Sequence, residues 1–244
     1  MTIHRHIGTA AVFVTLLVIW QGLHQLAGEN ALASPVETAV KLYAMMGDND
    51  FWGHVAETSY AFVMALVIGT VAGISLGIVL GVSRLSSQVA EPILINLYSI
   101  PKVTLYPLVL LCFGLGISAK VAFGVMHGMI PMTIFTMNAI RQMKPVYLRS
   151  SRVMRLTPLQ TAWTVVLPAI LPEVFSGIRL GFSLTLLGVL IGEMFASRRG
   201  LGFLITNAMN LGDTQTIMAI AVLLTAFAVT ANAGLVLLGG QGRR

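Results

Sequence analysis

Long apolar blocks, separated by short polar segments, run through the whole chain. A helix needs about 20 predominantly apolar residues to cross the hydrocarbon core of a bilayer, and most of these blocks reach that length. Only 10% of the 244 residues are Lys, Arg, Asp or Glu, whereas a soluble domain carries about 25% in order to solvate its surface. The sequence therefore predicts an all-α membrane protein with a single transmembrane domain over residues 1–244.

The pattern predicts about six membrane-spanning helices, near residues 7–26, 55–82, 91–115, 119–140, 172–196 and 216–238. The first block also fits a secretory signal, because Arg5 lies before it and Ala31-Leu32-Ala33 resembles a cleavage site. Its length of about 20 residues exceeds the usual core of a signal and favours a retained helix.

Positive residues gather in alternate gaps between the blocks, and this predicts the orientation of the chain. One set of gaps holds Arg5, Arg84, the stretch from Arg141 to Arg155, and Arg243 with Arg244. Cytoplasmic loops collect Lys and Arg, so both termini and the segment 141–171 are predicted to be cytoplasmic. The net charge of +6 forms no continuous basic face, and no nucleic-acid partner is predicted.

A stripe of glycines marks the second block, which reads GTVAGISLGIVLG. Gly69, Gly73, Gly77 and Gly81 are four residues apart and share one face of a helix. Small residues let membrane helices approach closely, so the stripe predicts tight packing. The partner helix belongs either to this chain or to a second copy.

Two places in the apolar blocks are candidates for a translocation path. Pro101 and Pro107 interrupt the third block, with Lys102 beside the break. At membrane depth, the free N–H and C=O groups of a broken helix must be satisfied by protein or by a water-filled cavity. One alternative is that the break lines a path, where Lys102 would meet an anion. The other is that the break only shapes helix packing and that Lys102 reaches the membrane interface. Glu193 is an ionisable residue in the fifth block, although an interfacial position close to Arg198 fits it equally.

No pattern for catalysis, a metal or a cofactor is found in the sequence. His24 and His54 are too isolated for a metal site, and His127 and Cys112 lie alone in apolar blocks, where packing is their usual role. The chain also lacks a phosphate loop with the pattern Gly-x-x-x-x-Gly-Lys-Ser/Thr. We therefore expect neither an enzyme nor a cofactor-binding protein.

The stretch LRSSRVMRLTPLQTAWTVVLPAILP, residues 148–172, combines arginines with three prolines. Pro145 permits a helix that ends near Leu156, about 18 Å long and too short to span a membrane. Arg149 and Arg152 are neighbours on it. A helix that contacts lipid head groups would account for these charges.

A second short helix is predicted after this one. Thr157 can act as its N-cap, Pro158 suits the first helical position, and Gln160 completes a capping box. Pro168 and Pro172 predict that this helix ends before the fifth span begins.

This region resembles the cytoplasmic EAA loop of permease subunits of bacterial binding-protein-dependent ABC importers. That loop has Glu-Ala-Ala, three residues, Gly, and later an Ile/Val-x-Leu-Pro ending. Arg149-Ser150-Ser151, Arg155 and Val165-Val166-Leu167-Pro168 stand at these positions here. The family's glycine would allow a positive φ, so Arg155 implies either a changed turn or a break made by the Thr157 cap.

The resemblance covers nearly the whole chain and extends to the nitrate, sulfonate and taurine subgroup. The matching pieces are Ile100-Pro101, Pro107-Leu108, Phe113-Gly114, Pro168-Ala169, Leu171-Pro172, Gly177-Ile178-Arg179, Gly192-Glu193-Met194, Gly200-Leu201-Gly202 and Leu204-Ile205. It implies the path of an inner-membrane importer for a small anion such as nitrate, a sulfonate or taurine. A permease for a neutral vitamin or pyrimidine precursor, and a membrane scaffold that transports nothing, remain alternatives.

The resemblance also implies partners. These are membrane lipid, a second copy of the chain, an extracytoplasmic solute-binding protein, and ATP-binding subunits that would hydrolyse ATP. The residues implied to couple to the ATPase are Arg149, Ser150, Ser151, Arg152, Met154, Arg155, Leu156 and Thr157. An arginine in place of the family's glutamate implies an acidic counterpart on the ATPase.

Overall fold

All of the regular structure is helical in the computed structural model, which describes residues 2–28 and 31–240. The helices are α1 (Thr2–Ala27), α2 (Pro35–Met46), α3 (Asn49–Val82), α4 (Arg84–Ser99), α5 (Tyr106–Phe113), α6 (Ile117–Arg141), α7 (Pro145–Val153), α8 (Pro158–Thr161), α9 (Leu167–Ala196), α10 (Leu201–Leu211) and α11 (Thr214–Gly240). The all-α prediction is confirmed.

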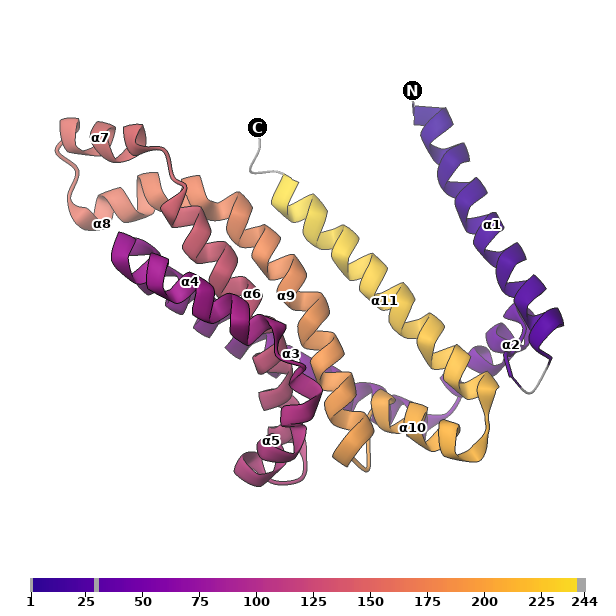
Figure 1. Ribbon diagram of the computed structural model, residues 1–244. Coiled ribbons are helices and arrows are strands. Elements are labelled where there is room, and N and C mark those ends of the chain that lie inside the picture. The colour runs from indigo at the N-terminus through magenta and orange to yellow at the C-terminus, as the bar shows by residue number, and fades with distance from the viewer. Residues whose placement is uncertain (1, 29–30, 241–244) are drawn as a thin grey trace.

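The centre of the molecule is formed by α3, α6 and α9, which pack against one another (Figure 1). A core cluster of Phe62, Ala65, Phe182 and Val189 joins α3 to α9. α11 lies alongside α9 and contacts α2 and α10, whereas α1 stands apart and contacts α2. Figure 1 also shows that α7 and α8 lie at one end of the bundle and that α5 and α10 lie at the other.

Within the described residues, four helical stretches are long and apolar enough to cross a membrane: Asn49–Val82, Ile117–Arg141, Pro158–Phe195 and Thr214–Leu237. A fifth is possible if α4 and the helical residues Lys102–Phe113 form one bent span. The apolar part of α1, Ala11–Ala27, is shorter than these stretches. The structure thus supports four or five of the six predicted spans.

The predicted third span, residues 91–115, is not one helix. α4 ends at Ser99, a 3₁₀ turn covers Lys102–Leu105 and leads into α5, and the stretch Lys102–Phe113 runs at 84° to α4. Ile100 is extended, with φ −62° and ψ 132°, because the residue before a proline is driven out of the helical region. Pro101 therefore sets the position of the bend.

The prediction that Pro168 and Pro172 end a separate short helix is wrong. A π-helical turn at Ala162–Val166 joins α8 directly to α9, which continues through Pro172 to Ala196. In this turn the Leu167 N–H donates to the Ala162 carbonyl. Pro168 comes directly after this turn, where the hydrogen-bond ladder has already been altered and can accommodate a residue without an N–H.

The glycine stripe of α3 lies against α6 of the same chain. All four glycines are buried. A Cβ built on Gly77 would lie 2.5 Å from the Thr136 Cβ and 2.8 Å from the Thr133 carbonyl oxygen, whereas one on Gly69 would meet its nearest atoms at 3.8 Å. A Cβ on Gly73 would meet its nearest atoms at 2.9 Å and one on Gly81 at 3.0 Å, so the two helices are closest in the middle of the stripe, around Gly77.

This difference predicts opposite effects of two alanine substitutions. Gly77→Ala is expected to lower the free energy of unfolding by about 1–3 kcal/mol, because the new methyl group overlaps α6. Gly69→Ala is expected to be neutral or to stabilise the helix by up to about 1 kcal/mol, because alanine has the better helix propensity. Unfolding of the detergent-solubilised protein by SDS, followed by circular dichroism, measures both. Equal stability of the two variants would contradict the packing described above.

Candidate functional site

A buried carboxylate, that of Glu193 on α9, lies where α3, α6, α9 and α10 meet. Its side chain is 0% exposed. The Thr58 hydroxyl donates to its two oxygens at 3.0 and 2.9 Å, and the Gly202 N–H donates at 2.9 Å. The Lys120 ammonium lies 3.7 Å away. Hydrogen-bond donors from α3 and α10 and a cation from α6 therefore compensate the burial of this carboxylate.

Lys120 extends this contact into a chain of charges. It is 1% exposed, and its Nζ donates to Glu57 Oε1 at 3.1 Å and to the Arg199 carbonyl at 2.8 Å. The order Glu57, Lys120, Glu193 crosses from α3 through α6 to α9. We call these three residues with Thr58 the charged node.

Glycines allow the loop between α9 and α10 to reach the charged node. Gly200 has φ 120°, a value that disfavours every other residue, and a Cβ there would overlap the Glu193 carboxyl group. The Gly200 N–H donates to His54 Nδ1 at 3.0 Å, and the Leu201 N–H donates to Thr58 Oγ1 at 2.8 Å. The Gly200-Leu201-Gly202 sequence thus places three backbone amides against buried acceptors.

The candidate path residues have different surroundings. Glu193 is enclosed by protein donors, and whether it lies along a path or at the membrane interface stays a prediction. Lys102 is 9% exposed. Its Nζ donates to the Tyr98 carbonyl at 2.9 Å and lies 4.9 Å from the centre of the Tyr98 ring. Pro101 is exposed at the bend, and its lining of a path stays a prediction.

Thr58, Glu57 and Lys120 were missed as functional candidates. Lys120 lies at the edge of a predicted span, where a lysine usually needs no special role. A signal was nonetheless available, since an acid within a membrane helix needs a nearby cation or strong donors. Nothing in the pattern marks Thr58, because a hydroxyl in an apolar block normally donates to its own helix.

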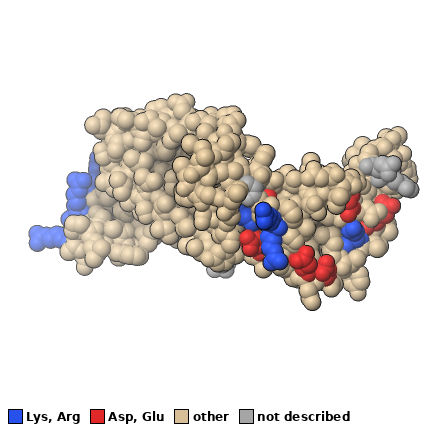
Figure 2. Space-filling view, turned by 90° about the horizontal axis from the view of Figure 1, so that it is seen from below, with Lys and Arg blue, Asp and Glu red and all other residues tan. Residues whose placement is uncertain are grey.

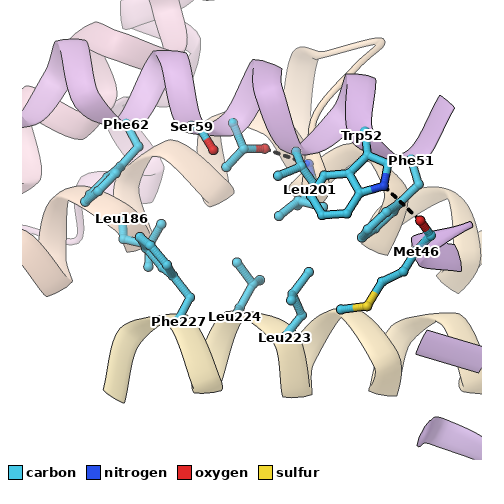
Figure 3. Close-up of a pocket in the computed structure, with 12 residues that line it drawn as sticks. Met46, Phe51, Trp52, Ser59, Phe62, Leu186, Leu201, Leu223, Leu224 and Phe227 are labelled. Carbon is cyan, nitrogen blue, oxygen red and sulfur yellow. Dashed lines mark hydrogen bonds between the residues drawn. The ribbon is translucent and has the colours of Figure 1, made fainter. Parts of the chain in front are cut away.

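An apolar cavity of about 120 Å³ lies between α3, α9 and α11 (Figure 3). Phe62, Leu186 and Phe227 close one end, and Trp52, whose Nε1 donates to the Met46 carbonyl at 2.9 Å, lies near the other. Such walls suit apolar groups, and the lining offers an anion no cationic partner, only the hydroxyls of Thr58 and Ser59. This cavity is therefore a poor candidate for an anion site.

α7 and the loop that follows it present most of the predicted coupling residues at the surface of the chain. Arg149, Ser150, Arg152, Met154, Arg155 and Thr157 are exposed, Leu156 is half-buried, and Ser151 is buried. The Ser151 hydroxyl donates to the Leu148 carbonyl at 3.0 Å. The charged face of α7 is therefore open to a partner.

Of the two alternatives predicted for this turn, the Thr157 cap is present, whereas the turn itself is not changed. Arg155 has φ 51°, which is the positive value that the family's glycine would supply. Thr157 and Gln160 then form a reciprocal capping box, with hydrogen bonds of 2.9 and 3.3 Å. α7 ends at Val153, three residues before the predicted end.

The strained turn leads to a prediction at Arg155. A non-glycine residue in the left-handed region costs about 1–2 kcal/mol, so Arg155→Gly is expected to raise the free energy of unfolding by about 1 kcal/mol. Arg152→Gly, inside α7, is expected to lower it by about 1 kcal/mol. Chemical unfolding of the two variants in detergent measures both. A loss of stability in both would show that the turn does not need a positive φ.

Comparison with known proteins identifies the family. The model of the binding-protein-dependent transport system inner membrane component matches residues 65–239. The chain belongs to this family. It is a permease subunit of an ABC importer, as predicted from its resemblance to the nitrate, sulfonate and taurine subgroup.

The relatives match the permease over most of their length. It is 30% identical to the nitrate import permease protein NrtB of Leptolyngbya laminosa, covering 90% of this chain and 81% of the relative. It is 27% identical to the taurine transport system permease protein TauC of Escherichia coli K12, with coverages of 87% and 79%. The riboflavin transport system permease protein RibX of Chloroflexus aurantiacus is 30% identical, with coverages of 86% and 80%.

A solved structure shares the fold. The MetNI methionine ABC transporter in inward-facing conformations matches with a TM-score of 0.64 over 78% of the permease and 95% of the solved chain. The sequences are 20% identical. This similarity supports the helical arrangement and carries no information on the solute.

Proposed function

We propose that two copies of the permease form the path by which a bacterial inner-membrane importer takes up a small anion, such as nitrate, a sulfonate or taurine. The observation that carries this proposal is the similarity to permeases named for nitrate, taurine and aliphatic sulfonates over about four fifths of their length. A separate ATPase supplies the energy, and an extracytoplasmic binding protein delivers the solute.

The arrangement of the chain supports the proposed orientation. α7, the first turns of α1 and the last turns of α11 lie at the same end of the bundle (Figure 1). The exposed arginines of α7 make that end positive, which is typical of the cytoplasmic side. The ATPase then binds at α7, and the binding protein docks at the end that carries α5 and α10.

A second candidate solute is a neutral vitamin or pyrimidine precursor. This candidate is supported by the similarity to RibX. It is also supported by the formylaminopyrimidine transport permease protein ThiX of Halalkalibacterium halodurans, which is 26% identical. Most of the permease is shared among all of these systems, so overall similarity does not separate the solutes.

Uptake into vesicles tests the proposal. The permease is reconstituted with its ATPase, ATP is enclosed, and the binding protein is added outside with labelled taurine, nitrate or riboflavin. We expect ATP-dependent accumulation of one of the anions and none of riboflavin. Accumulation of riboflavin alone would support the second candidate. If no solute accumulated and ATP hydrolysis did not respond to the binding protein, the scaffold alternative would be favoured.

A further inference from the structure

A groove of about 540 Å³ opens at the end of the molecule opposite α7. It lies between α3, the turn from α5 to α6, and the loop from α9 to α10. Its polar lining consists of Glu57, Lys120, Ser197, Arg198 and Arg199. Figure 2, which views the molecule from below, shows that charged residues of both signs gather on part of this face while much of the remaining surface carries none.

The charge balance of the groove is positive. The Glu57 carboxylate is paired with Lys120 at 3.1 Å. For Arg198 and Arg199, both exposed, no carboxylate of the described residues lies within 4.0 Å. Each guanidinium presents a planar set of five donors, which matches the oxygens of an oxyanion. Two such sets remain available at the rim of the groove.

The loop that carries the two arginines is held in place from several sides. The Arg199 N–H donates to Ser197 Oγ at 3.1 Å, and the Arg199 carbonyl accepts from Lys120 at 2.8 Å. The next two residues, Gly200 and Leu201, donate to His54 and Thr58. Because this backbone is already ordered, a ligand would not have to order it on binding.

We propose that this groove receives the oxyanion group of the transported solute, with Arg198 and Arg199 as its donors. This assignment deepens the proposed function and rests on it. The groove, at about 540 Å³, is large enough for a sulfonate with a short carbon chain and lies on the side from which the solute is delivered. Its apolar part, formed by Leu115, faces the same space and would contact the carbon atoms.

Binding of trifluoromethanesulfonate, followed by ¹⁹F line broadening, tests the assignment on the full chain in detergent. We expect saturable binding that methanesulfonate displaces. The double variant Arg198→Gln, Arg199→Gln is expected to bind at least about tenfold more weakly, because it loses charge-assisted hydrogen bonds. The double variant Arg84→Gln, Lys144→Gln removes the same charge from exposed positions and is expected to bind like the wild type.

Four results would overturn the assignment. The first is equal sulfonate binding by both double variants, and the second is no sulfonate binding by the wild type. The third is loss of bound phosphatidylglycerol from the Arg198/Arg199 variant, seen by native mass spectrometry, while sulfonate binding is unaffected, since a lipid phosphate offers the same chemistry. The fourth is loss of binding-protein docking in that variant while its sulfonate binding is intact.

Two claims can fail separately here: that the groove receives the oxyanion, and that the permease imports an anion. The ¹⁹F measurement needs no ATPase, whereas the proposed function is tested by ATP-driven uptake. If the wild type takes up an anion and the Arg198/Arg199 variant takes it up equally well, the groove is not the receiving site but the function stands. If the wild type takes up no anion, the proposed function fails whatever the groove binds.

Discussion

Glu193→Ala is expected to lower the free energy of unfolding by about 3–5 kcal/mol, because it removes one partner from a buried ion pair. Lys120 would keep Glu57 and the Arg199 carbonyl as partners. The Thr58 hydroxyl and the Gly202 N–H would lose their acceptor inside the protein. Denaturation in detergent, followed by tryptophan fluorescence, measures the change.

Two further variants serve as controls for this result. Glu173 lies on the same helix at an exposed position, and Glu173→Ala is expected to change the free energy of unfolding by no more than about 0.5 kcal/mol. Glu193→Gln keeps an oxygen acceptor and loses the charge, so its stability is expected to lie between those of the two alanine variants. A Glu193→Ala protein as stable as Glu173→Ala would mean that the charged node does not hold the four helices together.

Reversal of two charges on α7 is expected to abolish the complex with the ATPase. Arg149 and Arg152 are exposed on this short helix, and their place in the family loop implies an acidic counterpart. Like charges would then face each other in Arg149→Glu, Arg152→Glu, and we expect affinity to fall about a hundredfold or more. Co-purification of the ATPase with the tagged permease measures the loss.

The matched control for this experiment is Arg198→Glu, Arg199→Glu, which makes the same charge change at the opposite end of the molecule. It is expected to recover as much ATPase as the wild type. If replacing an acidic residue of the ATPase by lysine restored its binding to the α7 variant, that acidic residue would be identified as the counterpart. Equal recovery by all three proteins would place the ATPase contact elsewhere and leave the α7 arginines as a marker of the cytoplasmic side.

Local signals explain what could be predicted. The apolar blocks determine the helical class, Pro101 determines where α4 ends, and the Thr157–Gln160 pair determines where α8 begins. Each of these features acts within a few residues. α2 has a comparable signal, since Ser34 and Glu37 form a capping box and Pro35 stands in the first turn, although no helix is predicted above between the first two spans.

The features that were missed depend on contacts between distant parts of the chain. Lys120 and Glu193 are 3.7 Å apart although many residues separate them, and neither span indicates the other. The glycine spacing shows that one face of α3 is smooth, but it is compatible with any partner. Only the fold shows that this partner is α6. Continuation of α9 through Pro172 likewise depends on its tertiary packing and on the π-helical turn before it.

The most direct test of the central claim is the mass of the assembly purified with its ATPase. The tagged permease is co-expressed with the ATP-binding subunit, extracted in detergent and weighed by native mass spectrometry. A complex of two permeases with two ATPase subunits is the expected result, and it should dissociate in the α7 charge-reversal variant. Recovery of the wild-type permease with no ATPase bound would contradict its role as the membrane half of an ATP-driven importer.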